Sequence, residues 1–270
     1  MTEWDDLTHE ASAWEPDAER LATAHLRQAP SFLIIGTQKG GTSSLHHYLS
    51  RNNSVRMAIK KEVHFFDSYF GKGLAWYLAH FARRKDAVIT GEASPSYLMH
   101  PLVPRRVHGA FPQMRLIALL RNPVDRAYSH YQMNVRKGIE ALSFEDAVEQ
   151  EPSRLHDSDP DAAGGAFRRY SYVRRGLYAE QLQRWFQVFP REHVLLLRSE
   201  VFARDPDQEF RRVLTFLGLP EATLAKYRVR KGGDYPAMRM ETRQRLSAYF
   251  HPFNRQLYDL IDEDLGWDSI

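Results

Sequence analysis

Residues 32–49 read FLIIGTQKGGTSSLHHYL, and this stretch decides the fold class. It opens with an apolar run closed by a glycine, which predicts a short buried strand over residues 31–36. A polar, glycine-rich turn follows, and a helix is expected from Thr42 to about Ser50. Backbone N–H groups in such a turn, together with a helix N-terminus, attract anions. The stretch therefore predicts a strand, a phosphate-binding loop and a helix in succession.

Further apolar runs alternate with helical patterns along the chain. Strands are expected over residues 87–90, 114–120 and 193–197, and helices over 73–82, 124–136, 176–188 and 206–217. Strands that alternate with helices favour an α/β fold with a central parallel sheet and helices on both faces. Ligands of such sheets bind at the carboxyl ends of the strands. The residues that follow each apolar run are therefore the candidate site.

The chain has 270 residues, which fits one sizeable domain. We expect an N-terminal arm over residues 1–30, ending at Pro30, and a main domain over residues 31–270. The polar, turn-rich stretch 149–165 lacks apolar periodicity and is expected to form a mobile surface loop. It is interpreted either as a plain connector or as part of the acceptor site.

The composition excludes several classes of protein. The formal net charge is only +3, because 37 basic residues are nearly balanced by 34 acidic ones. This charge is too small for a protein that coats nucleic acid without sequence preference. The absence of cysteine excludes disulfides and thiolate metal sites, and it favours a cytoplasmic location. No apolar stretch is long enough for a membrane span, and no secretory signal is expected. The oligomeric state is not predicted.

The first loop differs from a Walker A motif. Gly36 and Gly41 have the spacing of that motif, but Thr42 stands where it requires lysine, and the lysine lies at position 39 instead. No acidic strand end suited to magnesium is evident. A P-loop nucleotide kinase therefore stays open as the alternative enzyme, and a non-catalytic nucleotide-binding protein as the alternative outside the enzymes.

The same loop resembles the 5′-phosphosulfate-binding loop of sulfotransferases that use 3′-phosphoadenosine 5′-phosphosulfate (PAPS). Its lysine-glycine-glycine-threonine variant is similar to the heparan sulfate (glucosaminyl) 3-O- and N-sulfotransferase branch. The resemblance implies a P-loop-like sulfotransferase fold, PAPS as co-substrate, 3′,5′-ADP as product and no metal. It also implies which residues bind the 5′-phosphosulfate: Lys39, Gly40, Gly41, Thr42 and Ser43. Lys39 is further expected to neutralise charge on the departing oxygen.

Residues 60–67, KKEVHFFD, supply the candidate proton acceptor. A carboxylate held near a histidine among aromatic residues is suited to accept a proton from a hydroxyl. Partial burial is expected to raise the pKa of Glu62, with the neighbouring lysines opposing that shift. The segment resembles the catalytic segment of the same branch. This implies that Glu62 is the general base and His64 a supporting or alternative base, with Asp67 a weaker candidate.

A second anion site is expected after the strand that ends at Leu120. An arginine at a strand end can donate two hydrogen bonds to a phosphate, and a serine two helical turns later can approach it from the other side. The pattern from Arg121 to Ser129, RNPVDRAYS, is similar to the 3′-phosphate-binding segment of sulfotransferases. Arg126 also matches, either as part of the site or as a structural ion-pair partner.

A basic, glycine-containing loop lies late in the chain, over residues 227–235. Basic residues beside two glycines are typical of an anion-binding loop. The resemblance to the sulfotransferase family implies which of its residues bind the 3′-phosphate: Arg230, Lys231, Gly232 and Gly233. Tyr227 or Tyr235 is expected to stack on adenine. The disulfide that commonly flanks this loop in the glucosaminyl branch cannot form in a chain without cysteine.

The stretch 91–97, GEASPSY, bears on the acceptor. It resembles a family segment with lysine after the glutamate, and Ala93 stands in place of that lysine. The substitution argues against a heparan-like polyanion. We expect a smaller or less anionic acceptor, such as a glycolipid, another glycan or a secondary metabolite, which receives the sulfuryl group on a hydroxyl or, second choice, an amine.

Overall fold

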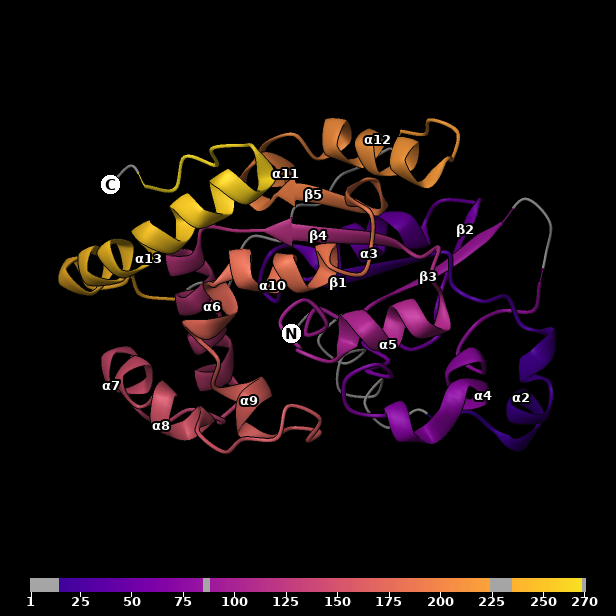
Figure 1. Cartoon of the computed structure of the whole chain (residues 1–270), viewed down its shortest axis with the longest axis horizontal. Helices are drawn as coiled ribbons and strands as arrows, with labels where there is room; N and C mark the ends of the chain where they lie inside the picture. Colours follow the sequence, from indigo (N-terminus) through magenta and orange to yellow (C-terminus); the bar gives the residue numbers. More distant parts are fainter. Residues whose placement is uncertain (1–14, 85–87, 224–234, 269–270) are drawn as a thin grey trace.

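The centre of the molecule is a five-stranded sheet with the order β2-β3-β1-β4-β5 (Figure 1). The computed structural model describes residues 15–84, 88–223 and 235–268. Its strands are β1 (Phe32–Gly36), β2 (Val55–Met57), β3 (Ile89–Ala93), β4 (Arg115–Leu120) and β5 (Val194–Arg198). Every neighbouring pair is parallel. The predicted parallel α/β fold is confirmed.

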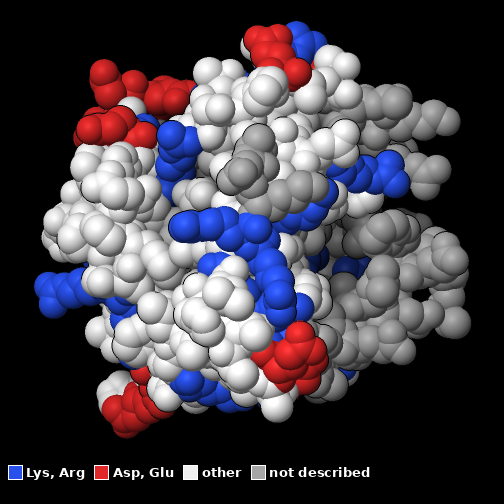
Figure 2. Space-filling view, turned by 90° about the vertical axis from the view of Figure 1, so that its right-hand side faces the viewer, with Lys and Arg blue, Asp and Glu red and all other residues white. Residues whose placement is uncertain are grey.

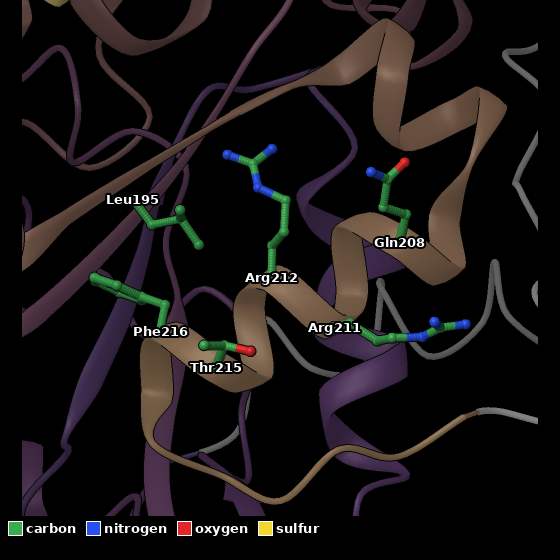
Figure 3. Close-up of a pocket in the computed structure, with 6 residues that line it drawn as sticks. All are labelled: Leu195, Gln208, Arg211, Arg212, Thr215 and Phe216. Atoms are coloured by element: carbon green, nitrogen blue, oxygen red, sulfur yellow. The ribbon is translucent and has the colours of Figure 1, made fainter.

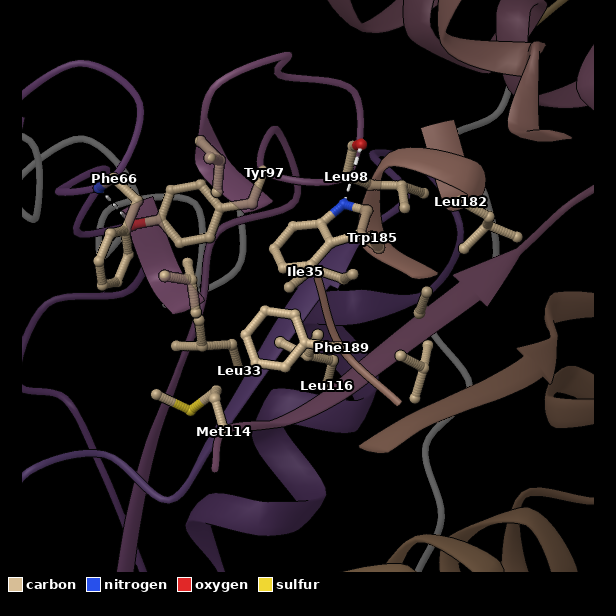
Figure 4. Close-up of a cluster of buried hydrophobic side chains, with 14 of the residues drawn as sticks. Leu33, Ile35, Phe66, Tyr97, Leu98, Met114, Leu116, Leu182, Trp185 and Phe189 are labelled. Carbon is tan, nitrogen blue, oxygen red and sulfur yellow. Dashed lines mark hydrogen bonds between the residues drawn. The ribbon is translucent and has the colours of Figure 1, made fainter. Parts of the chain in front are cut away.

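Successive side chains of the two central strands point to opposite faces of the sheet. Leu33 and Ile35 belong to one buried cluster together with Trp185, whereas Phe32 and Ile34 belong to another. Figure 4 shows the first cluster, in which the indole N–H of Trp185 donates to the carbonyl of Leu98 at 3.2 Å. Because both faces are covered, the strands read as continuous apolar runs rather than as alternating ones.

The helices divide between the two faces. Those described are α2 (Ala18–Ala22), α3 (Thr42–Ser50), α4 (Gly73–Leu78), α5 (Val103–Ala110), α6 (Pro123–Arg136), α7 (Phe144–Glu149), α8 (Glu151–Leu155), α9 (Ala166–Arg169), α10 (Tyr178–Phe186), α11 (Ser199–Arg204), α12 (Pro206–Leu217) and α13 (Met240–Ile261). Buried residues of α5, α10 and α13 join the cluster of Leu33, and those of α3 and α12 join the cluster of Phe32. Helices on both faces were predicted and are confirmed.

The sequence at the start of α6 makes the chain turn into this helix shortly after the end of β4. The side chain of Asn122 accepts from the N–H groups of Val124 and Asp125, and Pro123 occupies the first turn. Asparagine at the N-cap and proline at the first helical position are both favoured helix starts. The chain therefore turns into the helix immediately after Arg121.

Some predicted boundaries were wrong. The strand expected over residues 87–90 is β3 at 89–93, and the helix expected over 73–82 ends at Leu78. The stretch 149–165 is not wholly a loop, because α8 lies within it. Glu151 of α8 is buried and accepts from the N–H groups of Val173 and Arg174. These partners are distant in sequence, so local composition gave no sign of the helix.

Residues 15–30 lie against α4. Arg20 donates from Nε to the carbonyl of Ala79 at 2.7 Å and from Nη2 to that of Phe81 at 2.8 Å. Glu15 accepts from the indole N–H of Trp76 at 2.7 Å. This part of the predicted arm is therefore held to the main body by specific hydrogen bonds.

Figure 2 views the side at which β2, α2 and α4 lie in Figure 1. Lys and Arg side chains form a band across this face, with acidic side chains around it. The arrowheads of β4 and β5 point away from this side. The visible basic band therefore does not mark the carboxyl ends of these strands, where ligands of parallel sheets bind.

Candidate active site

The first predicted anion site is the loop between β1 and α3. Its Thr37 N–H donates to the carbonyl of Leu119 at 2.9 Å, so the loop is attached to the end of β4. A Cβ on Gly40 would lie 2.5 Å from that same carbonyl oxygen, and Gly41 has a φ of 103°. Only glycine tolerates both the close approach and the left-handed backbone. The glycine pair therefore lets the loop close over the start of α3.

The second predicted anion site begins at the end of β4. Arg121 donates from Nη1 to the carbonyl of Lys39 at 3.0 Å, and its own carbonyl accepts from the hydroxyl of Tyr178 at 2.8 Å. Ser129 is buried on α6. The structure therefore brings the two predicted loops into direct contact across the neighbouring strands β1 and β4.

Positive charge is concentrated where the loops meet. Burial is the main cause that lowers the pKa of Lys39 to about 8, followed by the nearby cations of Arg136 and Arg121. Arg126 and His130 are fully buried on α6, and Nε and Nη1 of Arg126 and Nδ1 of His130 have no hydrogen-bond partner among the described residues. Nε and Nη1 of Arg126 are donors, and buried donors without acceptors are costly, so these two groups fit a bound anion.

Arg126 forms no ion pair within the described ranges, and its Nη2 donates instead to the carbonyl of Tyr172. The interpretation of Arg126 as a structural ion-pair partner is therefore not supported. Its charge adds to the field around Lys39.

Raising the pH from about 7 to about 9 is expected to weaken binding of 3′,5′-ADP about tenfold. A bound phosphate raises the pKa of Lys39 from about 8, so binding above this pH requires proton uptake. The lysine is then neutral in the free protein and affinity falls. Calorimetry across this pH range measures the effect. Lys39→Arg, whose charge does not titrate there, is the control, and an equal pH dependence in that variant would contradict the assignment.

The candidate proton acceptor lies in the segment after β2. One carboxylate oxygen of Glu62 is 2.7 Å from Nζ of Lys61, and the other is 3.4 Å from Nε2 of His64. Nδ1 of His64 lies 2.9 Å from the buried carboxylate of Asp67. The predicted trio of Glu62, His64 and Asp67 is therefore brought together.

The charges of this trio depend on one another. Partial burial raises the pKa of Glu62, but Lys61 and His64 outweigh it and hold the pKa well below its usual range. Both expected contributions to the pKa of Glu62 are therefore present, and the cationic neighbours prevail because its side chain remains 38% exposed. For His64, burial lowers the pKa, and Asp67 more than offsets this and raises it. Glu62 is thus ionised at neutral pH and ready to accept a proton.

The backbone is strained at the same positions. Lys39, Glu62 and His64 have φ values of 71°, 61° and 57°, in the left-handed region that non-glycine residues rarely adopt. Each such residue costs on the order of 1–3 kcal/mol, and such strain concentrates at functional sites. Strain at three of the predicted site residues is thus an independent sign of function.

Arg168 is a site residue that the sequence did not reveal. Its Nη2 contacts Nε2 of His64 from α9, which directly follows the stretch 149–165. Arg175, buried beneath it, donates to its carbonyl at 3.0 Å. No local motif marks this arginine, and its role depends on contacts distant in sequence.

The predicted catalytic segment, residues 60–67, lies beside α3. Burial lowers the pKa of His46 to about 4, and the charge of Lys61 contributes to the shift while that of Glu62 opposes it. The N–H of Glu62 donates to the carbonyl of Ala93 at 3.1 Å, at the end of β3. Because β3 neighbours β1, Glu62 lies on the same edge of the sheet as the loop between β1 and α3.

The late basic loop lies mostly outside the described residues, including Tyr227 and the predicted anion-binding residues from Arg230 to Gly233. Tyr235 is described, and its ring centroid lies 5.6 Å from that of Tyr128 on α6. The hydroxyl of Tyr128 donates to the carbonyl of Pro236 at 2.8 Å. The chain therefore leaves this loop beside the helix that carries Ser129.

A separate surface pocket of about 430 Å³ lies between β5 and α12 (Figure 3). It is lined by Leu195, Gln208, Arg211, Arg212, Thr215 and Phe216. None of these is a predicted site residue, so the pocket is distinct from the anion sites. Within the described ranges, no helix is long and apolar enough to cross a membrane, and no group of three or more His, Asp or Glu is placed to hold a metal.

A parallel sheet with adjoining predicted anion sites after β1 and β4, and a carboxylate at the same edge, is typical of a nucleotide-dependent group transferase. The chain belongs to the sulfotransferase domain family, which it matches over residues 29–233. It is therefore an enzyme that transfers sulfuryl groups to a hydroxyl or amine, and the family implies PAPS as donor. The predicted resemblance is confirmed.

Several known proteins are similar over most of the chain. Mouse heparan sulfate glucosamine 3-O-sulfotransferase 6 is 35% identical, over 90% of this chain and 75% of its own length. Mouse heparan sulfate glucosamine 3-O-sulfotransferase 3B1 is 32% identical, over 94% and 68%. A crystal structure of a sulfotransferase from Alicyclobacillus acidocaldarius has 33% identity and a TM-score of 0.74, covering 88% of this chain and 98% of that one.

Proposed function

We propose that this sulfotransferase moves the sulfuryl group of PAPS to a hydroxyl of a small or weakly anionic acceptor, with Glu62 as general base. The observation that carries the proposal is the contact of the two anion sites beside an ionised carboxylate. Arg121 reaches the carbonyl of Lys39, and Glu62 lies at the same sheet edge.

PAPS would be held by its two anionic ends. The 5′-phosphosulfate would bind at the first loop, through Lys39, Gly40, Gly41, Thr42 and Ser43. The 3′-phosphate would bind Arg121 and Ser129, together with the late loop from Arg230 to Gly233, which lies outside the described residues. The unpartnered donors of Arg126 support this placement of negative charge. Fixing both ends of a donor converts binding energy into orientation of the reacting group.

The transfer itself is a single displacement. The acceptor oxygen bonds to sulfur while its proton passes to Glu62, and the bond from sulfur to the bridging oxygen of the 5′-phosphate breaks. Lys39 neutralises the charge that develops on that oxygen. The products are a sulfate ester and 3′,5′-ADP. His64, oriented by Asp67, supports Glu62 or acts as the alternative base.

The acceptor is inferred from the charges around the base. Ala93 is fully buried and supplies no charge at the end of β3. Arg168 instead supplies one cation beside His64. We therefore propose a small or weakly anionic acceptor, although the relatives named above are heparan sulfate enzymes. Cytoplasmic location is part of the proposal and rests on the cysteine-free sequence.

Calorimetry with 3′,5′-ADP and with ATP plus magnesium is expected to give at least about tenfold tighter binding of 3′,5′-ADP, because only this ligand places a phosphate at both sites. Labelled PAPS should then transfer its label to small hydroxyl compounds in preference to heparan sulfate or heparosan. Tighter binding of magnesium ATP would contradict the donor assignment. A preference for heparosan would contradict the acceptor assignment alone.

A further inference from the structure

Glu92, at the end of β3, is a buried carboxyl group that the proposed reaction does not use. It is 1% exposed. One of its oxygens accepts from the hydroxyls of Tyr97 at 2.9 Å and Tyr77 at 3.1 Å, and the other accepts from Ser94 at 2.9 Å. Three hydroxyl groups, two from the segment after β3 and one from α4, thus donate to one buried carboxyl group.

Two of these hydroxyls also hold the catalytic segment. The N–H of His64 donates to Oγ of Ser94 at 3.2 Å, and the N–H of Phe66 donates to the hydroxyl of Tyr97 at 3.3 Å, a bond visible in Figure 4. The N–H of Glu62 donates to the carbonyl of Ala93. Every second N–H from residue 62 to residue 66 is therefore fixed to the segment 93–97.

The direction of these hydrogen bonds requires an acceptor at Glu92. A hydroxyl has a single hydrogen, and the oxygens of Ser94 and Tyr97 already accept from backbone N–H groups. Their hydrogens must point elsewhere, and the carboxylate of Glu92 receives both. The hydroxyl of Tyr77 contacts the same carboxylate but no N–H of the catalytic segment.

The catalytic segment needs such support, because Glu62 and His64 have left-handed backbones. Strained conformations persist only where the surroundings fix them. We infer that Glu92 is a positioning residue, which orients Ser94 and Tyr97 so that they hold Glu62 and His64 in place. This inference rests on the proposed function, since it concerns the geometry of the proposed bases.

A stabilising role does not account for this acid. Burial raises the pKa of Glu92 to about 7, and the bonds from Ser94 and Tyr97 and the charge of His64 only partly oppose it. An acid whose pKa is raised on folding favours the unfolded state once it ionises. The fold therefore loses stability as the pH rises through about 7 and Glu92 ionises, a cost that is typical of groups retained for function.

The test compares two variants that remove one hydroxyl each from the same carboxylate oxygen. Tyr97→Phe is expected to lower kcat about tenfold, because a displaced catalytic group loses rate. Tyr77→Phe is expected to stay within about twofold of the wild type, since its hydroxyl holds no catalytic N–H. Both variants should keep the KM for PAPS and the affinity for 3′,5′-ADP, and both should lower Tm by similar amounts.

Glu92→Gln supplies the second measurement. It should lower kcat at least as much as Tyr97→Phe, without a larger loss of Tm than Tyr77→Phe. Glu140→Gln is the matched control, because Glu140 is also buried and accepts from a tyrosine hydroxyl, that of Tyr172 at 2.9 Å. It should keep the wild-type kcat.

Equal kcat in the two tyrosine variants, or a wild-type kcat in Glu92→Gln, would overturn the positioning role. A wild-type enzyme that binds 3′,5′-ADP but transfers no label would instead contradict the proposed function. The two failures are therefore distinguishable.

Discussion

Replacing Glu62 with Gln is expected to lower turnover by about 10²–10⁴-fold, the range typical of a lost general base. Glutamine keeps the shape and the hydrogen-bonding carbonyl of Glu62 but cannot accept the proton of the acceptor. The two anion sites are built by other residues, so the affinity for 3′,5′-ADP should change little. Steady-state rates with labelled PAPS, combined with calorimetry, measure both quantities.

His64 is the control for this prediction. Its pKa is raised by Asp67, whereas that of Glu62 is held low by Lys61 and His64. If Glu62 is the base, activity should persist below neutral pH, where His64 is protonated. Turnover close to that of the wild type in Glu62→Gln, with loss of rate as His64 protonates, would transfer the role to His64.

Replacing Arg121 with Ala is expected to weaken PAPS binding about 10–100-fold, while binding of adenosine 5′-phosphosulfate falls much less. The guanidinium provides charge-assisted hydrogen bonds to the 3′-phosphate, which only the first ligand carries. Some loss is expected for both ligands, since Arg121 also holds the carbonyl of Lys39. Calorimetry with both ligands separates the two contributions.

Ser129→Ala gives a cleaner comparison, because no hydrogen bond from Ser129 to the first loop is seen in the described structure. It should reduce PAPS affinity less than Arg121→Ala does and leave adenosine 5′-phosphosulfate unaffected. Equal losses for the two nucleotides in Arg121→Ala would contradict the 3′-phosphate assignment.

Much of the fold could be predicted because the central strands are buried on both faces. The residues of β1 are apolar throughout, as are five of the six in β4, so their runs are unmistakable. By contrast β2 has three residues, one of them the charged Arg56, and no pattern of that length is distinctive. The short helix α8 was missed because its Glu151 binds backbone groups that come later in the chain.

The residues of the candidate site also divide into those that a local motif revealed and those that no motif revealed. Lys39, Arg121 and Glu62 could be predicted because each lies within a local motif, and the structure places them at one sheet edge. Arg168 could not be, because it reaches His64 from 104 residues away. The role of Glu92 was also hidden, since a single acid in a sequence gives no sign that three hydroxyls surround it.

The direct bonds between the two loops have a consequence for ligand choice. Thr37 is hydrogen-bonded to Leu119 and Arg121 to Lys39, so the two proposed anion sites are held at a fixed separation by these bonds. Under the proposed assignment, this separation would select the nucleotide by the distance between its phosphates. A phosphate on the 2′ rather than the 3′ oxygen, or a longer polyphosphate chain, would reach one pocket and miss the other, and discrimination would arise without any group that repels the wrong ligand.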